Sequence, residues 1–257
     1  MTAIRSIEIL GCRVDDVTLD EAVALCDRLV QAGRPAQVVT PNAEIVDAAQ
    51  GDPELRELIN RSALSIPDGA GLLLAGRLLG TPLRAQVTGT DLAYRLARLS
   101  AERGYRLFLL GAGPGVAEAA AARLAGLYPG LRIAGTFAGT HSPSGDRETR
   151  AAVAATQPVD VLLVAYGAGR QERWIARNQS ALGVPLALGI GGGLDFMSGR
   201  VRRAPAWLRR LGLDWLFRLT MQPWRWRRQL ALPRFVGRVL LSARHARRLA
   251  DRLRSQH

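Results

Sequence analysis

The sequence predicts an α/β fold, with a mostly parallel sheet sandwiched by helices and a basic, helical C-terminal appendage. Short apolar runs of strand length alternate with longer amphipathic segments over residues 1–199. Runs that are apolar throughout are typical of strands buried on both faces, and such strands belong to parallel sheets covered by helices. Arginine and tryptophan dominate residues 200–257 instead. We therefore predict two units, a catalytic or binding body (1–199) and an appendage (200–257).

The predicted strands are short apolar runs bounded by glycine, proline or polar residues. They comprise residues 4–10, 37–40, 63–67, 105–110, 131–137, 159–167 and 185–190. Thr18 caps the first predicted helix, and Asp52-Pro53 starts another, because proline suits the first helical position. Thr90 is expected to cap a third helix. Further helices are predicted over residues 116–128, near 147–156 and from about Arg170.

Charge separates the two predicted units. Residues 1–199 hold 19 arginines and 20 acidic residues, a net charge of −1, and the chain has no lysine. Residues 200–257 hold 16 arginines and two acidic residues, a net charge of +14, which accounts for the total of +13. A segment this basic is expected to attract phosphate in a membrane, a diphosphate substrate or a nucleic acid. A nucleic-acid-binding protein should carry a basic face on its core, so the nearly neutral body argues against that class.

The appendage is expected to fold into short helices separated by Pro205, Pro223 and Pro233. An amphipathic, membrane-binding face is predicted from apolar residues at helical spacing and two tryptophans, namely Leu213, Leu216, Phe217, Met221, Trp215 and Trp224. A packed pair of C-terminal helices and a nucleic-acid patch are the alternative interpretations of this segment.

Several classes of protein are not supported by the composition. No apolar run approaches the roughly 18 residues of a membrane-spanning helix, and the first ten residues do not resemble a secretory signal. Cys12 and Cys26 are expected to be core residues in a reducing cytoplasm. The histidines are scattered, and the D-x-D and P-loop motifs are absent, so no metal site and no cofactor are predicted.

Polar residues follow several predicted strands, where ligands bind in open parallel sheets. Asp68 comes after an apolar strand and could act as a general base, or it could cap the next helix. Thr40 and Asn42 could orient a sugar hydroxyl or cap a helix. The residues alone leave both interpretations open for Thr40, Asn42 and Asp68.

Two glycine-rich runs could approach a nucleotide. The run from Gly111 to Gly115 resembles a dinucleotide fingerprint, but its third glycine comes one position early, which weakens the case for a dehydrogenase. Gly191, Gly192 and Gly193 are better candidates for backbone contact with a base or phosphate, although tight packing would also explain them. Asp195 could accept hydrogen bonds from uracil or ribose, or cap a helix.

If the pocket binds a nucleotide whose diphosphate leaves during the reaction, and no metal ion is present, cationic side chains must neutralise that diphosphate. The arginines of the appendage could do so. The appendage arginines predicted to bind substrate are Arg203, Arg218, Arg225 and Arg228.

Nine stretches of the sequence resemble, in order and spacing, the WecG/TagA/CpsF family of bacterial glycosyltransferases, glycosyltransferase family 26. They are TPNAE (40–44), IPDGAG (66–71), VTGTDL (87–92), FLLGAGPGVAE (108–118), GAGRQE (167–172), GIGGGLDFMSG (189–199), RRAPAW (202–207), LDWLFRL (213–219) and QPWRWRR (222–228). The likeness covers residues 4–240, nearly the whole chain.

The resemblance implies a Rossmann-like core and an inverting transferase that moves a sugar from a UDP-sugar to a polyprenyl-diphosphate-linked glycan for bacterial cell-surface or exopolysaccharide synthesis. It implies that the appendage holds the enzyme peripherally at the cytoplasmic face of the plasma membrane and closes the active site. Asp68 takes the role of the base, with Thr40 and Asn42 beside it. Gln171 matches an active-site glutamine, and Asp195 and the glycines at 191–193 fall in the nucleotide pocket. A homo-oligomer is left open.

The sequence departs from the family pattern at a few positions. Gln86 stands where an arginine is common, with Arg84 nearby as a possible substitute, and Gly169-Arg170 replaces a Pro-Lys pair. These departures leave the donor sugar open between N-acetylmannosamine-type and glucose.

Overall fold

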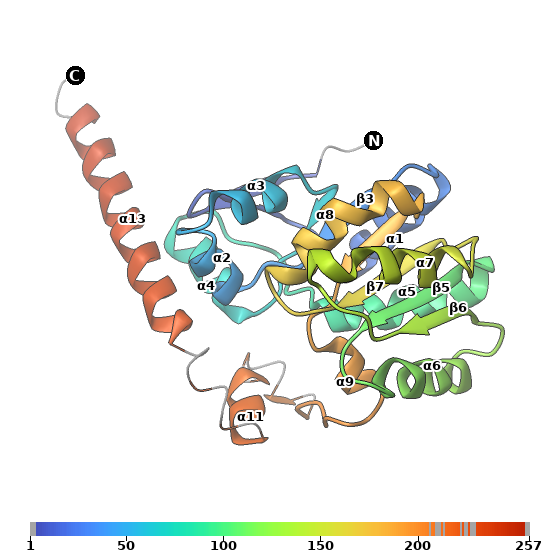
Figure 1. Ribbon diagram of the computed structural model, residues 1–257. Helices are drawn as coiled ribbons and strands as arrows, with labels where there is room; N and C mark the ends of the chain where they lie inside the picture. Colours follow the sequence, from blue (N-terminus) through green and yellow to red (C-terminus); the bar gives the residue numbers. More distant parts are fainter. Residues whose placement is uncertain are drawn as a thin grey trace.

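The computed structural model describes residues 4–205, 207–208, 212, 214–221, 223, 226 and 230–254. Its main sheet has six strands in the order β4-β3-β8-β7-β5-β6, and every neighbouring pair is parallel (Figure 1). The strands are β3 (Ala36–Val39), β4 (Leu64–Ser65), β5 (Arg106–Gly111), β6 (Arg132–Phe137), β7 (Val161–Ala165) and β8 (Leu186–Gly189). The predicted parallel sheet is confirmed.

Helices cover both faces of this sheet. One face packs against α1 (Leu19–Gln31), α5 (Gly89–Arg103), α6 (Val116–Leu127) and α9 (Gly193–Met197). The other packs against α7 (Asp146–Ala154), which follows a short 3-10 turn, η1 (Pro143–Gly145), and against α8 (Arg170–Leu182).

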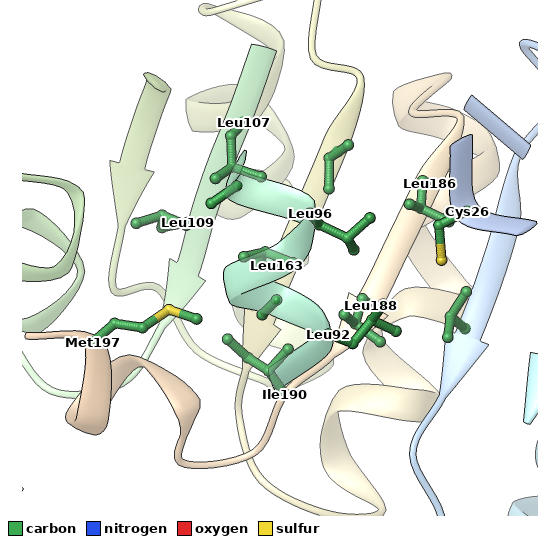
Figure 2. Close-up of a cluster of buried hydrophobic side chains, with 14 of the residues drawn as sticks. Cys26, Leu92, Leu96, Leu107, Leu109, Leu163, Leu186, Leu188, Ile190 and Met197 are labelled. Atoms are coloured by element: carbon green, nitrogen blue, oxygen red, sulfur yellow. The ribbon is translucent and has the colours of Figure 1, made fainter. Parts of the chain in front are cut away.

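The side chains of the apolar strand β5 show why helices pack on both faces of the main sheet. Leu107 and Leu109 join the cluster that contains Leu92 and Leu96 of α5 (Figure 2). Phe108 and Leu110 point to the other side and join the cluster around Trp174 of α8. Because successive side chains of a strand alternate between faces, an unbroken apolar run produces a sheet that is buried on both sides.

A third cluster lies at the β4 edge and includes elements outside the sheet. It joins α2 (Ala43–Ala48), α3 (Pro53–Arg61), α4 (Ala70–Leu78) and the antiparallel hairpin of β1 (Ser6–Ile9) and β2 (Cys12–Asp15). The predicted strand at 4–10 is therefore real but pairs with β2 instead of the main sheet. Leu10 and Gly11 make the turn with φ of 51° and 77°. Leu-Gly lacks the asparagine or aspartate that usually marks such a turn, so the hairpin was not predicted.

The helix caps agree with prediction in one case and differ in another. Thr18 and Glu21 form a reciprocal capping box at the start of α1. The predicted cap at Thr90 is wrong, because the side chain of Thr88 accepts the hydrogen bond from Asp91 N and α5 begins at Gly89. Cys12 and Cys26 are buried, as predicted, and burial raises the pKa of the Cys26 thiol to about 12.

The described parts of the appendage include α11 (Asp214–Met221) and the long helix α13 (Ala231–Arg254). Figure 1 shows α13 alongside α2 and α4, where Phe235 and Val239 are buried. The prediction that Pro233 separates short helices is wrong, since α13 runs for 24 residues through it. Pro233 lies in the first helical turn, where a backbone N–H has no intrahelical acceptor to lose. Within the described residues, no helix is long and apolar enough to cross a bilayer.

Candidate active site

A cavity of about 1270 Å³ opens over the carboxyl ends of β4, β3, β8 and β7. Thr40 and Asn42 follow β3, Asp68 follows β4, Gln171 lies after β7, and Gly191 follows β8; all five line it. The parallel order of these strands brings to one edge residues that are up to 151 positions apart in the sequence (191 minus 40). This is where parallel α/β sheets bind ligands.

Asp68 is held in place by backbone groups on both sides. Its N–H donates to Pro41 O at 2.9 Å, and its carboxylate accepts from Gly89 N at 3.1 Å. The side chain does not cap α4, whose N-cap is Gly69, but binds the start of α5 instead. The carboxylate is thus oriented at the cavity, where it can accept a proton from a bound hydroxyl group.

Thr40 and Asn42 each make a structural hydrogen bond beside Asp68. The Thr40 hydroxyl donates to Gly189 O at 3.1 Å, which links the ends of β3 and β8. Asn42 Oδ1 accepts from Ile45 N at 3.0 Å and caps α2, so the capping interpretation holds for that oxygen. The hydroxyl oxygen of Thr40 can also accept, and the Asn42 amide nitrogen can donate to a ligand.

Gln171 is a buried side chain that forms a hydrogen bond with the glycine-rich loop at 191–193. It is 2% exposed, and its Oε1 accepts from Gly191 N at 2.9 Å. Its Nε2 donates to Glu172 Oε1 at 2.9 Å, and Glu172 Oε2 accepts from Gly169 N at 2.6 Å. A β-carbon on Gly189 would lie 2.5 Å from Gln171 Nε2, which explains that glycine. Burial raises the pKa of the Glu172 carboxyl, against the effect of these hydrogen bonds.

The loop residues Gly191, Gly192, Gly193 and Asp195 all line the cavity. Gly191 has a φ of 55°, and a β-carbon there would meet no atom within 4 Å, so its backbone faces open space. Gly193 is packed, since a β-carbon there would lie 3.1 Å from Ile190. Asp195, in the first turn of α9, presents its carboxylate from the element that follows this loop.

Gly111 lies apart from this group and does not line the cavity. Its φ is 101°, and a β-carbon would lie 2.9 Å from the backbone carbonyl carbon of Ala165. Close approach of β5 to β7 therefore accounts for the glycine. The carboxyl end of β5 is one strand beyond those that carry the cavity.

The appendage lies over the same cavity. Arg203 Nη1 pairs with Asp91 Oδ1 at 2.7 Å, and its guanidinium lies 6.0 Å from the centre of the Phe196 ring. Gly212 approaches α4 so closely that a β-carbon would lie 2.6 Å from that of Ala70. Trp215 also lines the cavity. Some appendage residues predicted to act lie outside the described residues. They are Arg225, Arg228, Leu213, Trp224 and, for its side chain, Arg218.

Several lining residues were not predicted from the sequence. Tyr166 follows β7, and burial raises its pKa to about 12. Arg84, which the sequence offered as a possible substitute for a family arginine, does line the cavity, but it pairs with Asp16 at 3.3 Å and with Glu21 at 2.7 Å. Arg77, on α4, carries no motif that would mark it. In the described part of the chain, no three histidine, cysteine or acidic side chains gather as metal ligands.

Comparison with known proteins identifies the family. The model of the glycosyl transferase WecG/TagA/CpsF family matches residues 7–249. The chain belongs to this family. The WecG/TagA/CpsF proteins similar to it include the N-acetylglucosaminyldiphosphoundecaprenol N-acetyl-beta-D-mannosaminyltransferase of Bacillus subtilis strain 168, which is 33% identical over 80% of this chain and 79% of the relative.

The protein of the same name from Staphylococcus aureus strain MW2 is 28% identical over 93% of both chains. Because this match extends into the appendage, the WecG/TagA/CpsF likeness is not confined to the sheet and its helices. The chain is accordingly a glycosyltransferase, and the nucleic-acid-binding alternative is not favoured.

Proposed function

We propose that this enzyme transfers a sugar from a UDP-sugar to a polyprenyl-diphosphate-linked acceptor in bacterial cell-surface or exopolysaccharide synthesis. The observation that carries the proposal is the position of the Asp68 carboxylate. It faces a cavity bounded by the glycine-rich loop on one side and by the appendage on another. The relatives are named for transfer of N-acetylmannosamine to N-acetylglucosaminyldiphosphoundecaprenol, which supports an acceptor of this class. The donor sugar is N-acetylmannosamine-type or glucose.

The reaction follows as a single displacement. The acceptor's hydroxyl oxygen attacks the anomeric carbon of the donor, and the bond from that carbon to the UDP oxygen breaks with inversion. The hydroxyl proton passes to Asp68, and the electron pair of the broken bond leaves with UDP. The Gly191 and Gly193 N–H groups are bonded to Gln171 Oε1 and Ile190 O, so the Gly192 N–H and arginine side chains bind the negative charge that develops on the diphosphate.

Thr40, Asn42 and Gln171 act around this centre. Thr40 and Asn42 orient the reacting sugars through the hydroxyl oxygen and the amide nitrogen. Gln171 fixes the Gly191 backbone against the nucleotide, and Asp195 accepts hydrogen bonds from the uridine. Arg203 borders the diphosphate from the appendage, and Arg218, Arg225 and Arg228 are proposed to add to it.

The appendage is proposed to hold the enzyme at the cytoplasmic face of the plasma membrane. Its exposed apolar side chains support this, since Trp207, Trp226 and Met221 are 61%, 54% and 50% exposed. Arginine near an anionic bilayer adds about 1 kcal/mol per residue, so several together suffice for peripheral attachment.

The test is a panel of UDP-sugars offered with a synthetic polyprenyl-diphosphate N-acetylglucosamine, with the product read by mass spectrometry. One donor is expected to add a single hexose-type unit. Asp68→Asn should then lower turnover by about 10²–10⁴, whereas Glu57→Gln, at an exposed surface pair, should not. Absence of transfer from every donor, or near-normal turnover by Asp68→Asn, would overturn the proposal.

A further inference from the structure

One face of α4 forms a wall of the cavity. Ala70, Leu73, Leu74 and Arg77 line it and recur at the spacing of one helical face. The opposite face, represented by Leu72, is buried in the cluster with the hairpin and α13. Leu73 also packs against that cluster, so the part of α4 that is available to a ligand is its exposed side, which carries Leu74 and Arg77.

The chemistry changes along this wall. Asp68 lies just before the helix, Ala70 leaves room next to it, Leu74 is 44% exposed, and Arg77 lies in the last turn. At about 1.5 Å per residue, the seven helical steps from Ala70 to Arg77 span roughly 10 Å. A long arginine side chain on a helix leans toward the N-terminus, which brings the guanidinium closer to Asp68.

Arg77 differs from the other arginines that line the cavity. Arg84 is paired with Asp16 and Glu21, and Arg203 is paired with Asp91. Arg170 lies next to Gln171, on the side of the glycine-rich loop, and approaches His141 Nε2 at 3.4 Å. Among the residues that the structure describes, Arg77 has no hydrogen-bond or ion-pair partner for its guanidinium.

We propose that Arg77 binds the diphosphate of the lipid-linked acceptor and that Leu74 and Trp215 contact the first apolar units of its lipid. This inference rests on the proposed function. Such an acceptor carries a sugar hydroxyl, a diphosphate and an apolar chain in that order. The wall offers Asp68 for the hydroxyl and the Arg77 guanidinium beyond it for the diphosphate, to which arginine can donate two parallel hydrogen bonds.

Apolar side chains of α4 and of the appendage line the same cavity and could contact the apolar part of the ligand. Trp215 of α11 is 37% exposed and lines the cavity together with Leu232 of α13 and Leu74. A lipid that leaves the diphosphate at Arg77 would therefore pass between α4 and the appendage, toward the exposed side chains of Trp207 and Trp226.

The test pairs an enzyme variant with a change in the acceptor. Wild type, Arg77→Gln and Arg77→Lys are assayed with N-acetylglucosamine diphosphate on a short alkyl chain, and with the same sugar on the alkyl chain without phosphate. We expect Arg77→Gln to lower kcat/KM for the diphosphate acceptor about 10- to 100-fold, to leave the neutral acceptor unchanged, and to leave the Kd of UDP unchanged. Arg77→Lys should restore part of the loss. Arg98→Gln, which removes an exposed pair with Glu102, is the matched control.

Three outcomes overturn the inference: no loss with Arg77→Gln, an equal loss with both acceptors, or weaker binding of UDP. Calorimetric binding of the alkyl diphosphate acceptor without a donor makes the test independent of turnover. If wild type transfers no sugar but binds this acceptor through Arg77, the proposed function fails and the inference stands. If transfer proceeds and Arg77 has no effect on acceptor binding, only the inference fails.

Discussion

The carboxylate of Asp47, on α2, accepts a hydrogen bond at 2.8 Å from the guanidinium of Arg238, on α13. Arg234, one turn earlier on α13, pairs with the other carboxylate oxygen at 3.1 Å. Asp47 is only 7% exposed, and Phe235 of α13 is buried in the cluster that also contains residues of α2. The two arginine–Asp47 interactions therefore lie beside this buried contact between α2 and α13. Because α2 begins directly after Asn42, this contact connects the C-terminal helix to the loop that carries two predicted catalytic residues.

We expect Asp47→Asn to lower the free energy of unfolding by about 1–3 kcal/mol, because two arginines lose a largely buried charged partner. The position of the Thr40–Asn42 loop depends on α2, so acceptor KM should also rise. Urea denaturation and steady-state kinetics measure the two effects. Glu57→Gln, which removes an exposed pair with Arg61 at 3.3 Å, should cost less than about 1 kcal/mol. Equal stability of the two variants would contradict the assignment.

Glu172 should make stability depend on pH. Burial raises its pKa above the ordinary value of 4.5 in the folded protein. The folded state therefore binds the proton more tightly than the unfolded chain, and the stability gained from this is present below pH 4.5 and lost as pH rises through the folded pKa. Glu172→Gln has no such proton. The stability of wild type relative to this variant should fall as pH rises above 4.5, by at most about 1.4 kcal/mol per pH unit. Parallel stability curves for the two proteins would exclude this origin.

The main sheet could be predicted because its signals are local. An unbroken apolar run such as residues 105–110 needs helices on both sides wherever it lies, and Thr18 caps its helix through a residue three positions away. The β1–β2 hairpin and the packing of α13 were not predictable in this way. The hairpin depends on an unusual Leu-Gly turn, and α13 depends on contacts between residues such as Asp47 and Arg238, which are 191 positions apart.

The candidate site was predictable where strand ends carry polar residues. Thr40, Asp68, Gln171 and Gly191 were all predicted, and the structure places them around one cavity. Gly111 also stands at a strand end, as the last residue of β5, but it lies outside the cavity because β5 is beyond β7 in the sheet. The order of strands in the sheet could not be predicted from the sequence. Arg77 gave no signal because an exposed arginine late in a helix is common, and only its neighbours in space make it notable.

Alanine substitutions at Gly111 and Gly191 should separate packing from nucleotide contact. Gly111→Ala places a carbon 2.9 Å from the Ala165 backbone at a φ of 101°, so it should cost about 1–3 kcal/mol of stability. The Kd of UDP for the folded fraction should not change. Gly191→Ala meets no atom within 4 Å, so it should cost about 1 kcal/mol for its positive φ and weaken UDP binding. Calorimetry with UDP and thermal denaturation distinguish the two. Weaker UDP binding in Gly111→Ala alone would reverse the assignment.

The exposed tryptophans of the appendage should determine attachment to a bilayer. Point substitutions are preferable to removal of residues 200–257, because truncation would uncover the core surface that Phe235 and Val239 bury. We expect Trp207→Ser combined with Trp226→Ser to weaken binding to vesicles rich in anionic phospholipid about tenfold or more, since interfacial binding scales with the apolar area that enters the bilayer. Leu127→Ser is the matched control, because Leu127 is 57% exposed and belongs to α6, outside the appendage sequence. Sedimentation with vesicles measures the effect, and added salt should weaken the remaining attraction by screening the arginines. Unchanged binding of the double variant, or an equal loss in Leu127→Ser, would show that the appendage does not attach the enzyme through these side chains.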